Sequence, residues 1–150
     1  MRLVLQRVKK ASVLINNTLY SSINNGFLVL VGIEADDTYD DIEWLCSKVC
    51  NMRVFADAEG KLNLDIKQIN GELLIVSQFT LHASTKKGNR PSFIKAARPE
   101  IAIPLYEKFI SETEKQMGKL CKTGQFGADM QIELINDGPV TIILDSKNKE

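Results

Sequence analysis

The most unusual polar residues of the chain follow an apolar run with no turn residue between them. The run Leu73–Val76 continues directly into Ser77-Gln78-Phe79-Thr80-Leu81. A buried strand normally ends at a turn residue rather than at hydrogen-bonding side chains around an aromatic ring, so these hydroxyl and amide groups could belong to a reaction site. A strand end that bonds only to its own loop would carry the same residues. The segment alone leaves both interpretations open.

Other chemically active residue types form no recognisable catalytic set. His82 is the only histidine, and no Gly-x-Ser-x-Gly sequence accompanies it, which favours a polar residue at a strand end over a general base. Cys46 and Cys50 lack the four-ligand spacing of a zinc site, and Cys46 adjoins an apolar stripe, where cysteine acts as a small hydrophobe. Phosphate loops and dinucleotide fingerprints are also missing. We therefore expect no metal and no cofactor.

Two further segments could serve a site or only shape the surface. Asn136-Asp137-Gly138-Pro139 has the composition of a hairpin turn. Residues 82–98 are polar and contain five cations but no acid, namely Lys86, Lys87, Arg90, Lys95 and Arg98. Such a stretch suits contact with phosphates, although a solvated basic loop has the same composition.

The elements that must position these residues follow from hydrophobic periodicity. Strands are predicted at 2–8, 12–15, 18–20, 27–33, 73–81, 130–134 and 140–144. A first helix follows the acids at 36–37, and its apolar stripe is Ile42, Leu45, Val49 and Met52. A second helix has the stripe Ala102, Leu105, Phe109, Thr113 and Met117, with Gly118 as its C-cap. The pattern predicts a β-rich α/β fold with a sheet or barrel-like strand core and two main helices.

Length and composition set the frame for that fold. The 150 residues suit a single domain spanning 1–150, and 44% hydrophobic with 25% charged residues is typical of globular proteins. No apolar run reaches the roughly 18 residues of a membrane span, and the N-terminus lacks a signal-peptide core, so we expect a cytoplasmic protein. An odd number of cysteines, three, favours reduced thiols. Zero net charge argues against sequence-blind coating of nucleic acid.

Four segments in this order resemble the D-aminoacyl-tRNA deacylase family. They are Ser77–Leu81, Lys87–Phe93, Thr123–Met130 and Asn136–Thr141. The opening Met1-Arg2 and the strand segment Gln6-Arg7-Val8 also look like that family. The resemblance spans essentially the whole chain.

The resemblance implies an enzyme that hydrolyses the ester between a D-amino acid and the 3′-terminal adenosine of tRNA. It also implies removal of glycine from the wrong tRNA, and a homodimer with active sites at the subunit interface. Ser77, Gln78, Phe79 and Thr80 match the catalytic motif of the family. Gly138 and Pro139 match a Gly-Pro motif whose peptide bond is cis and which reaches into the partner's active site to exclude L-amino acids.

The same resemblance suggests how the rest of the substrate is held. Phe126 and Met130 match residues that bind the terminal adenosine, although core packing is the ordinary role of such a phenylalanine. Arg7 would anchor the Gly-Pro segment, and the cations Lys86, Lys87 and Arg90 would contact tRNA phosphates.

Thr80 is open to two roles. It could act as nucleophile, but no base is evident beside it and an unactivated hydroxyl is weak, which favours a positioning role. Three rival functions remain at this level: a non-catalytic module that binds RNA 3′ ends, an esterase for small acyl esters, and a purely structural dimer.

Overall fold

A computed structural model describes all 150 residues. The elements in chain order are β1 (Arg2–Ile15), β2 (Thr18–Ile23), β3 (Gly26–Gly32), α1 (Tyr39–Asn51), β4 (Phe55–Ala56), β5 (Leu62–Leu64), β6 (Glu72–Ser77), the 3₁₀ turn η1 (Phe79–His82), α2 (Pro99–Met117), β7 (Lys122–Thr123) and β8 (Gln131–Asp145). The predicted β-rich α/β class with two main helices is confirmed. Neither helix combines the length and apolar character needed to cross a membrane.

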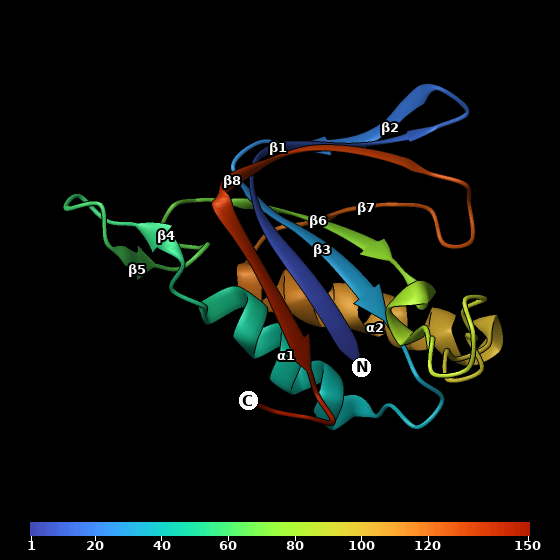
Figure 1. Cartoon of the computed structure of the whole chain (residues 1–150). Coiled ribbons are helices and arrows are strands. Elements are labelled where there is room, and N and C mark those ends of the chain that lie inside the picture. Colours follow the sequence, from blue (N-terminus) through green and yellow to red (C-terminus); the bar gives the residue numbers. More distant parts are fainter.

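The main sheet has six strands and curls into a nearly closed barrel (Figure 1). Its order is β2-β1-β3-β6-β7, and β8 pairs with the other edge of β1. The pairs that β1 makes with β2, β3 and β8 are antiparallel, whereas β3-β6 and β6-β7 are parallel. Strand β1 pairs with β3 through residues 2–8 and with β2 through residues 11–15. The long strand β1 therefore connects β2 to the rest of the sheet.

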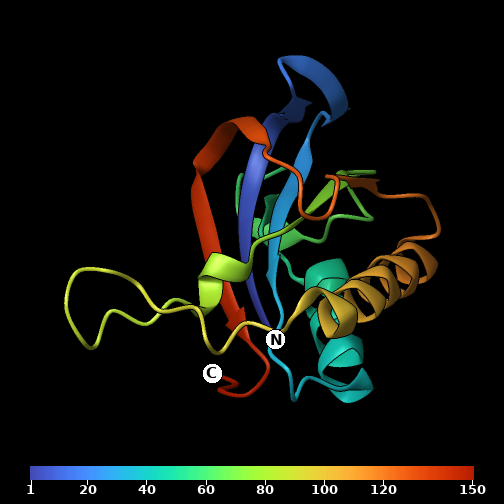
Figure 2. The same cartoon turned by 90° about the vertical axis from the view of Figure 1, so that its right-hand side faces the viewer.

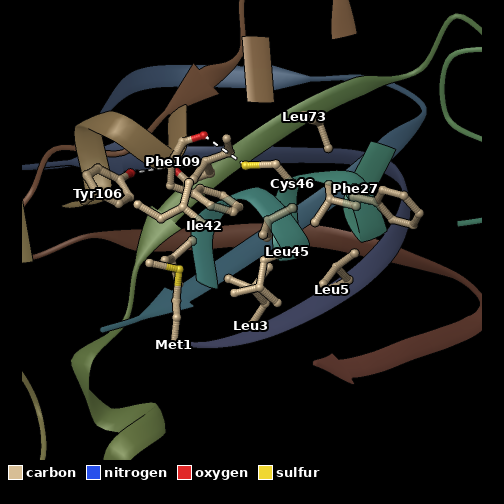
Figure 3. Close-up of a cluster of buried hydrophobic side chains, with 14 of the residues drawn as sticks. Met1, Leu3, Leu5, Phe27, Ile42, Leu45, Cys46, Leu73, Tyr106 and Phe109 are labelled. Carbon is tan, nitrogen blue, oxygen red and sulfur yellow. Dashed lines mark hydrogen bonds between the residues drawn. The ribbon is translucent and has the colours of Figure 1, made fainter. Parts of the chain in front are cut away.

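Two hydrophobic cores lie on opposite faces of β3 and β6. Alternate residues of a strand face opposite sides. Phe27, Val29 and Val31 therefore join the core beneath α1 and α2, which Figure 3 shows around Leu45 and Phe109. The intervening Leu28 points into the barrel, together with Leu74 and Val76 of β6. A strand buried on both faces reads as a continuous apolar run, as the sequence of β3 does.

The helices pack on one face of the sheet and on each other (Figures 1 and 2). The Cys46 thiol of α1 is fully buried, 3.2 Å from the Thr113 hydroxyl of α2. Burial raises the pKa of Cys46 to about 12, which keeps the thiol neutral and confirms its role as a small hydrophobe. The buried stripe of α2 includes Tyr106, whereas the predicted Leu105 is only partly buried.

Three sequence predictions about the strands are wrong in detail. The runs 2–8 and 12–15 form one strand, and the run 73–81 ends as a strand at Ser77 before the η1 turn. The segment 136–139 is no hairpin turn, because β8 continues through it opposite β1 with shifted register. Here the Asn136 side chain accepts from the Val140 N–H at 3.0 Å and donates to the Thr141 hydroxyl at 2.9 Å. These bonds replace those of a regular ladder and let the strand continue.

Candidate active site

A pocket of about 260 Å³ lies at the carboxyl ends of the parallel strands β3 and β6. Most of its lining is apolar, and the residues come from four separate parts of the chain. They are Val31, Ile33, Val76, Ser77, Gln78, Phe79, Ala97, Ala102, Phe126, Gly127, Ala128, Met130 and Ile132. A mostly apolar pocket with a few polar groups at one side is the usual form of a small-ligand site.

The polar side of the pocket is the predicted motif that follows β6. Ser77 ends the strand opposite Val31, and the Gln78 N–H donates to the Val31 carbonyl at 2.7 Å. This bond fixes the point where the chain leaves the sheet. The amide nitrogen of Gln78 donates to the Thr80 hydroxyl. Thr80 itself is exposed on η1 and does not line the pocket.

The η1 turn also supplies main-chain donors at the same place. It begins at Phe79, so the N–H groups of Phe79 and Thr80 have no acceptor within the turn. The Leu81 and Ala83 N–H groups, by contrast, are bound to the carbonyls of Gln78 and Thr80. The N–H groups of Phe79 and Thr80 and the Gln78 amide belong to three consecutive residues, of which Gln78 and Phe79 line the pocket.

The apolar wall comes from the segment between β7 and β8. Gly124 donates its N–H to the Ile75 carbonyl at 3.0 Å, and a Cβ at this glycine would lie 2.6 Å from the Met130 sulfur. Glycine is therefore needed for Met130 to take its place in the pocket wall. Phe126 packs on Tyr106 at 5.8 Å between ring centroids and also lines the pocket, so it serves both the core and the wall.

Sequence reasoning missed the supporting role of Tyr106. Its hydroxyl donates to the carbonyl of Ile75, two residues before Ser77, at 2.8 Å. Burial raises the pKa of Tyr106 above its ordinary value, so the phenol stays protonated and remains a donor. The spacing of Tyr106 from Ala102 and Phe109 follows the helical stripe and would have identified it.

No titratable side chain lines the pocket. The sequence predicted that His82 is a polar residue at a strand end. In the structure it is instead a buried residue of η1, and its ring lies against Gly32. Glu34 Oε1 lies 3.1 Å from its Nδ1, yet neither ring nitrogen makes a hydrogen bond. His82 does not line the pocket that holds the motif.

One acidic cluster has the geometry of a cation site, but protein cations already occupy its surroundings. It consists of Glu34, Asp36 and Asp37. The buried Asp37 pairs with the α-amino group of Met1, and the Lys147 ammonium lies 3.7 Å from the same carboxylate. These contacts place two positive charges beside Asp37 and join the cluster to the C-terminal segment.

Gly138 and Pro139 lie apart from the pocket lining. Their peptide bond is cis, and Gly138 has φ of 126°. Arg7 of β1 is nearly buried beside them, where its Nε donates to the Asp137 carbonyl at 3.0 Å and its Nη1 to the Val54 carbonyl. The Asp137 carboxylate lies 3.4 Å from the Arg7 Nε. Arg7 thus contacts the segment directly.

The basic stretch forms an exposed loop between η1 and α2. Lys86, Lys87 and Arg90 are exposed, and none of them forms an ion pair or lines the pocket. In Figure 2 this yellow-green loop extends away from the barrel. Its cations are free to meet an external anion.

The whole chain is similar to the members of one protein family. Residues 4–145 match the family model described as D-Tyr-tRNA(Tyr) deacylase. The D-aminoacyl-tRNA deacylase of Flavobacterium psychrophilum is 59% identical over 150 residues, with both chains covered completely. That of Cytophaga hutchinsonii is 63% identical, with 98% of each chain covered.

Two solved structures are similar as well. One, a c-Myc DNA unwinding element binding protein, is 41% identical with a TM-score of 0.92, and the match covers 97% of this chain and 98% of that one. A probable eukaryotic D-amino acid tRNA deacylase shares the fold at a TM-score of 0.80 and 18% identity, over 95% and 97% of the two chains. The family match and the identities, which extend over nearly the whole chain, show that this chain belongs to the D-Tyr-tRNA(Tyr) deacylase family.

Proposed function

We propose that the chain hydrolyses the ester bond of D-aminoacyl-tRNA and releases the D-amino acid and free tRNA. The observation that carries this proposal is the pocket itself. It joins the amide of Gln78 to an apolar wall formed by Phe126 and Met130, which are distant in the sequence. One side suits an acyl ester and the other suits a nucleobase, and both parts occur in the 3′ end of a charged tRNA.

Hydrolysis of an ester places negative charge on the carbonyl oxygen as water attacks. The free N–H groups of Phe79 and Thr80 and the amide of Gln78 are suited to stabilise that charge. A single donor of this kind contributes about 3–4 kcal/mol to the transition state. This electrostatic contribution is the main catalytic effect that we assign to the chain.

Activation of the water must come from a group other than a side chain of the pocket, because no titratable residue lines it. The 2′-hydroxyl of the terminal ribose lies beside the ester in every such substrate and can place or activate the water. The Thr80 hydroxyl accepts a hydrogen bond from Gln78, which lowers its nucleophilicity. We therefore assign Thr80 a positioning role.

The wall of the pocket would hold the terminal adenine. Phe126 and Met130 supply a flat apolar surface, and Phe126 is fixed from behind by Tyr106. Stacking of a base on an aromatic ring contributes about 1–3 kcal/mol. The exposed Lys86, Lys87 and Arg90 would contact the phosphates that precede it.

Selection against L-amino acids would need a second copy of the chain. Gly138 and Pro139 do not line the pocket of their own chain, and β8 pairs only with β1, so its other edge is free. In a homodimer, main-chain oxygens of this segment would accept from the substrate's ammonium group and leave no room for an L side chain. Arg7 would keep the segment in place. Glycine has no side chain to exclude, so glycyl-tRNA would also be a substrate. A protein that acts on charged tRNA would work in the cytoplasm, where charged tRNA occurs.

Parallel deacylation of D-tyrosyl-tRNA and L-tyrosyl-tRNA tests this proposal, with a Gly138→Ala variant beside the wild type. We expect fast release of D-tyrosine only, and weaker discrimination in the variant. Tight binding of the tRNA 3′ end without release of either amino acid would contradict it and indicate an RNA-binding module. Equal rates on small acyl esters, insensitive to salt, would indicate a general esterase.

A further inference from the structure

An exposed aromatic pair stands at the mouth of the pocket. Phe79 lines the pocket, yet 57% of its surface is exposed, and Phe93 of the basic loop is 37% exposed. Their ring centroids are 5.2 Å apart at an interplanar angle of 74°. Phe93 does not line the pocket, so the pair joins a ring of the pocket lining to a ring outside it.

The backbone around Phe93 is tied down on both sides. Ser84 and Ser92 exchange two main-chain hydrogen bonds of 2.8 and 2.9 Å, which close the tip of the loop. On the other side, the Ala97 N–H donates to the Ile33 carbonyl at 2.8 Å, and the Phe93 carbonyl accepts from the Ala96 N–H at 3.0 Å. Phe93 is thus held in place next to Phe79. The tip of the loop extends away from the barrel (Figure 2).

The chain segment that carries Phe93 has charges of one sign. The loop and the residue that precedes α2 carry Lys86, Lys87, Arg90, Lys95 and Arg98, all exposed, and no acid lies among residues 83–98. None of the nine ion pairs in the molecule involves them. Aromatic rings beside free cations are the usual surface for single-stranded nucleic acid, where bases stack and phosphates meet positive charge.

We propose that Phe93, together with Phe79, forms a stacking platform for the unpaired nucleotides that precede the terminal adenosine of the substrate tRNA. This inference rests on the proposed function and extends it from one nucleoside to the single-stranded 3′ end. A chain leaving the pocket past Phe79 meets Phe93 next and then the cations of the loop. The platform therefore distinguishes a tRNA end from a free aminoacyl nucleoside.

A comparison of two substrates tests the platform. D-tyrosyl-adenosine, esterified at its ribose, fills only the pocket, whereas D-tyrosyl-tRNA also carries the unpaired nucleotides. In Phe93→Leu, which keeps apolar bulk but removes the aromatic face, we expect kcat/KM for the tRNA to fall about 5- to 100-fold. The value for D-tyrosyl-adenosine should stay within twofold of wild type. Leu120→Ala, at a site that is 84% exposed beyond the far end of α2, is the control and should change neither value.

Each other outcome has a distinct meaning. An equal fall on both substrates would overturn the platform, because Phe93 would then act on the pocket alone. No change on either substrate would overturn it as well, while leaving the proposed function intact. A shift in the sedimentation of Phe93→Leu would identify the aromatic pair as a contact between copies. Wild-type protein that cleaves neither substrate would overturn both proposals.

Discussion

The pocket and the Gly138–Pro139 segment both hold motif residues, and they are built on different principles. The pocket is apolar, free of titratable side chains and supported from behind by the buried Tyr106. The Gly138–Pro139 segment is part of an edge strand and is held by a nearly buried arginine. The lining of the first region comes from four parts of the chain, and Gly138 and Pro139 are not among them.

Under the proposed function, the difference would let one small fold combine catalysis with selection. Groups that stabilise a transition state must be fixed before the reaction, and the pocket gains this rigidity from the carboxyl ends of β3 and β6. Groups that exclude a substrate need only stand where its side chain would be. Under the proposed function, a segment on a free strand edge can be presented to a second copy without changing the pocket of its own chain.

The largest effect is expected in the pocket. Gln78→Ala removes an amide donor from the anion site, and we expect kcat for D-tyrosyl-tRNA to fall about 100- to 1,000-fold. The melting temperature should not change, because Gln78 keeps its main-chain bond to Val31. Gln125→Ala is the control, since this exposed amide lies next to the wall residue Phe126 but does not line the pocket. A loss of similar size in the control would weaken the assignment.

The second prediction concerns the edge segment. A Cβ at Gly138 would lie 2.7 Å from the Arg7 Nη2 and 3.0 Å from Val140, at a φ of 126°. Gly138→Ala should therefore lower the free energy of unfolding by about 2 kcal/mol and reduce the ratio of D to L hydrolysis about tenfold or more. Gly60→Ala also has positive φ, but nothing lies within 4 Å of its Cβ, so it should lose only about 1 kcal/mol and keep the ratio. Denaturant titration and parallel deacylation measure both.

A third prediction concerns the stability of the fold at low pH. No titratable side chain lines the pocket, and the prediction concerns Asp41 of α1. Burial raises the pKa of Asp41, but hydrogen bonds from Lys147, Ser146 and Thr38 outweigh it and hold the pKa below its ordinary value of 3.8. The stability that Asp41 contributes is therefore present above about pH 4 and is lost as pH falls further.

Asp41→Asn should cost about 1 kcal/mol at neutral pH, because it also disrupts the capping box of α1. The deficit should shrink below pH 4, while kcat at neutral pH stays unchanged. Asp40→Asn, at an exposed position in the same turn, is the matched control. Urea titrations across this pH range would contradict the prediction if the deficit stayed constant.

The smallest effect is expected at Thr80, on the rim of the pocket. Its hydroxyl accepts from Gln78 but does not line the pocket. Thr80→Ala should therefore retain kcat within about tenfold of wild type, because only the orientation of the Gln78 amide is weakened. Single-turnover deacylation measures this directly. A near-complete loss with folding intact would identify Thr80 as the nucleophile.

Local patterns predicted most elements but misread how some of them end. The run from Leu73 to Leu81 looks like one strand, yet β6 stops at Ser77, where the Gln78 N–H bonds across to Val31. The composition of residues 136–139 indicates a turn, yet Arg7 and the side chain of Asn136 keep the strand continuous. In each case one of the deciding hydrogen bonds, Gln78 to Val31 or Arg7 to Asp137, joins partners distant in the chain, which no local pattern contains.

The sequence by itself determined the fold class, the apolar faces of strands and helices, and the order of the motif segments, since these depend on composition and period. Only the tertiary structure decided which motif residues meet. It brought Gln78 together with Phe126 and Met130, because parallel pairing puts the carboxyl ends of β3 and β6 at one edge and the segment after β7 bonds to Ile75 beside them. It also placed Gly138 outside that pocket, because β8 contributes only Ile132 near its start to the lining and then runs on along β1.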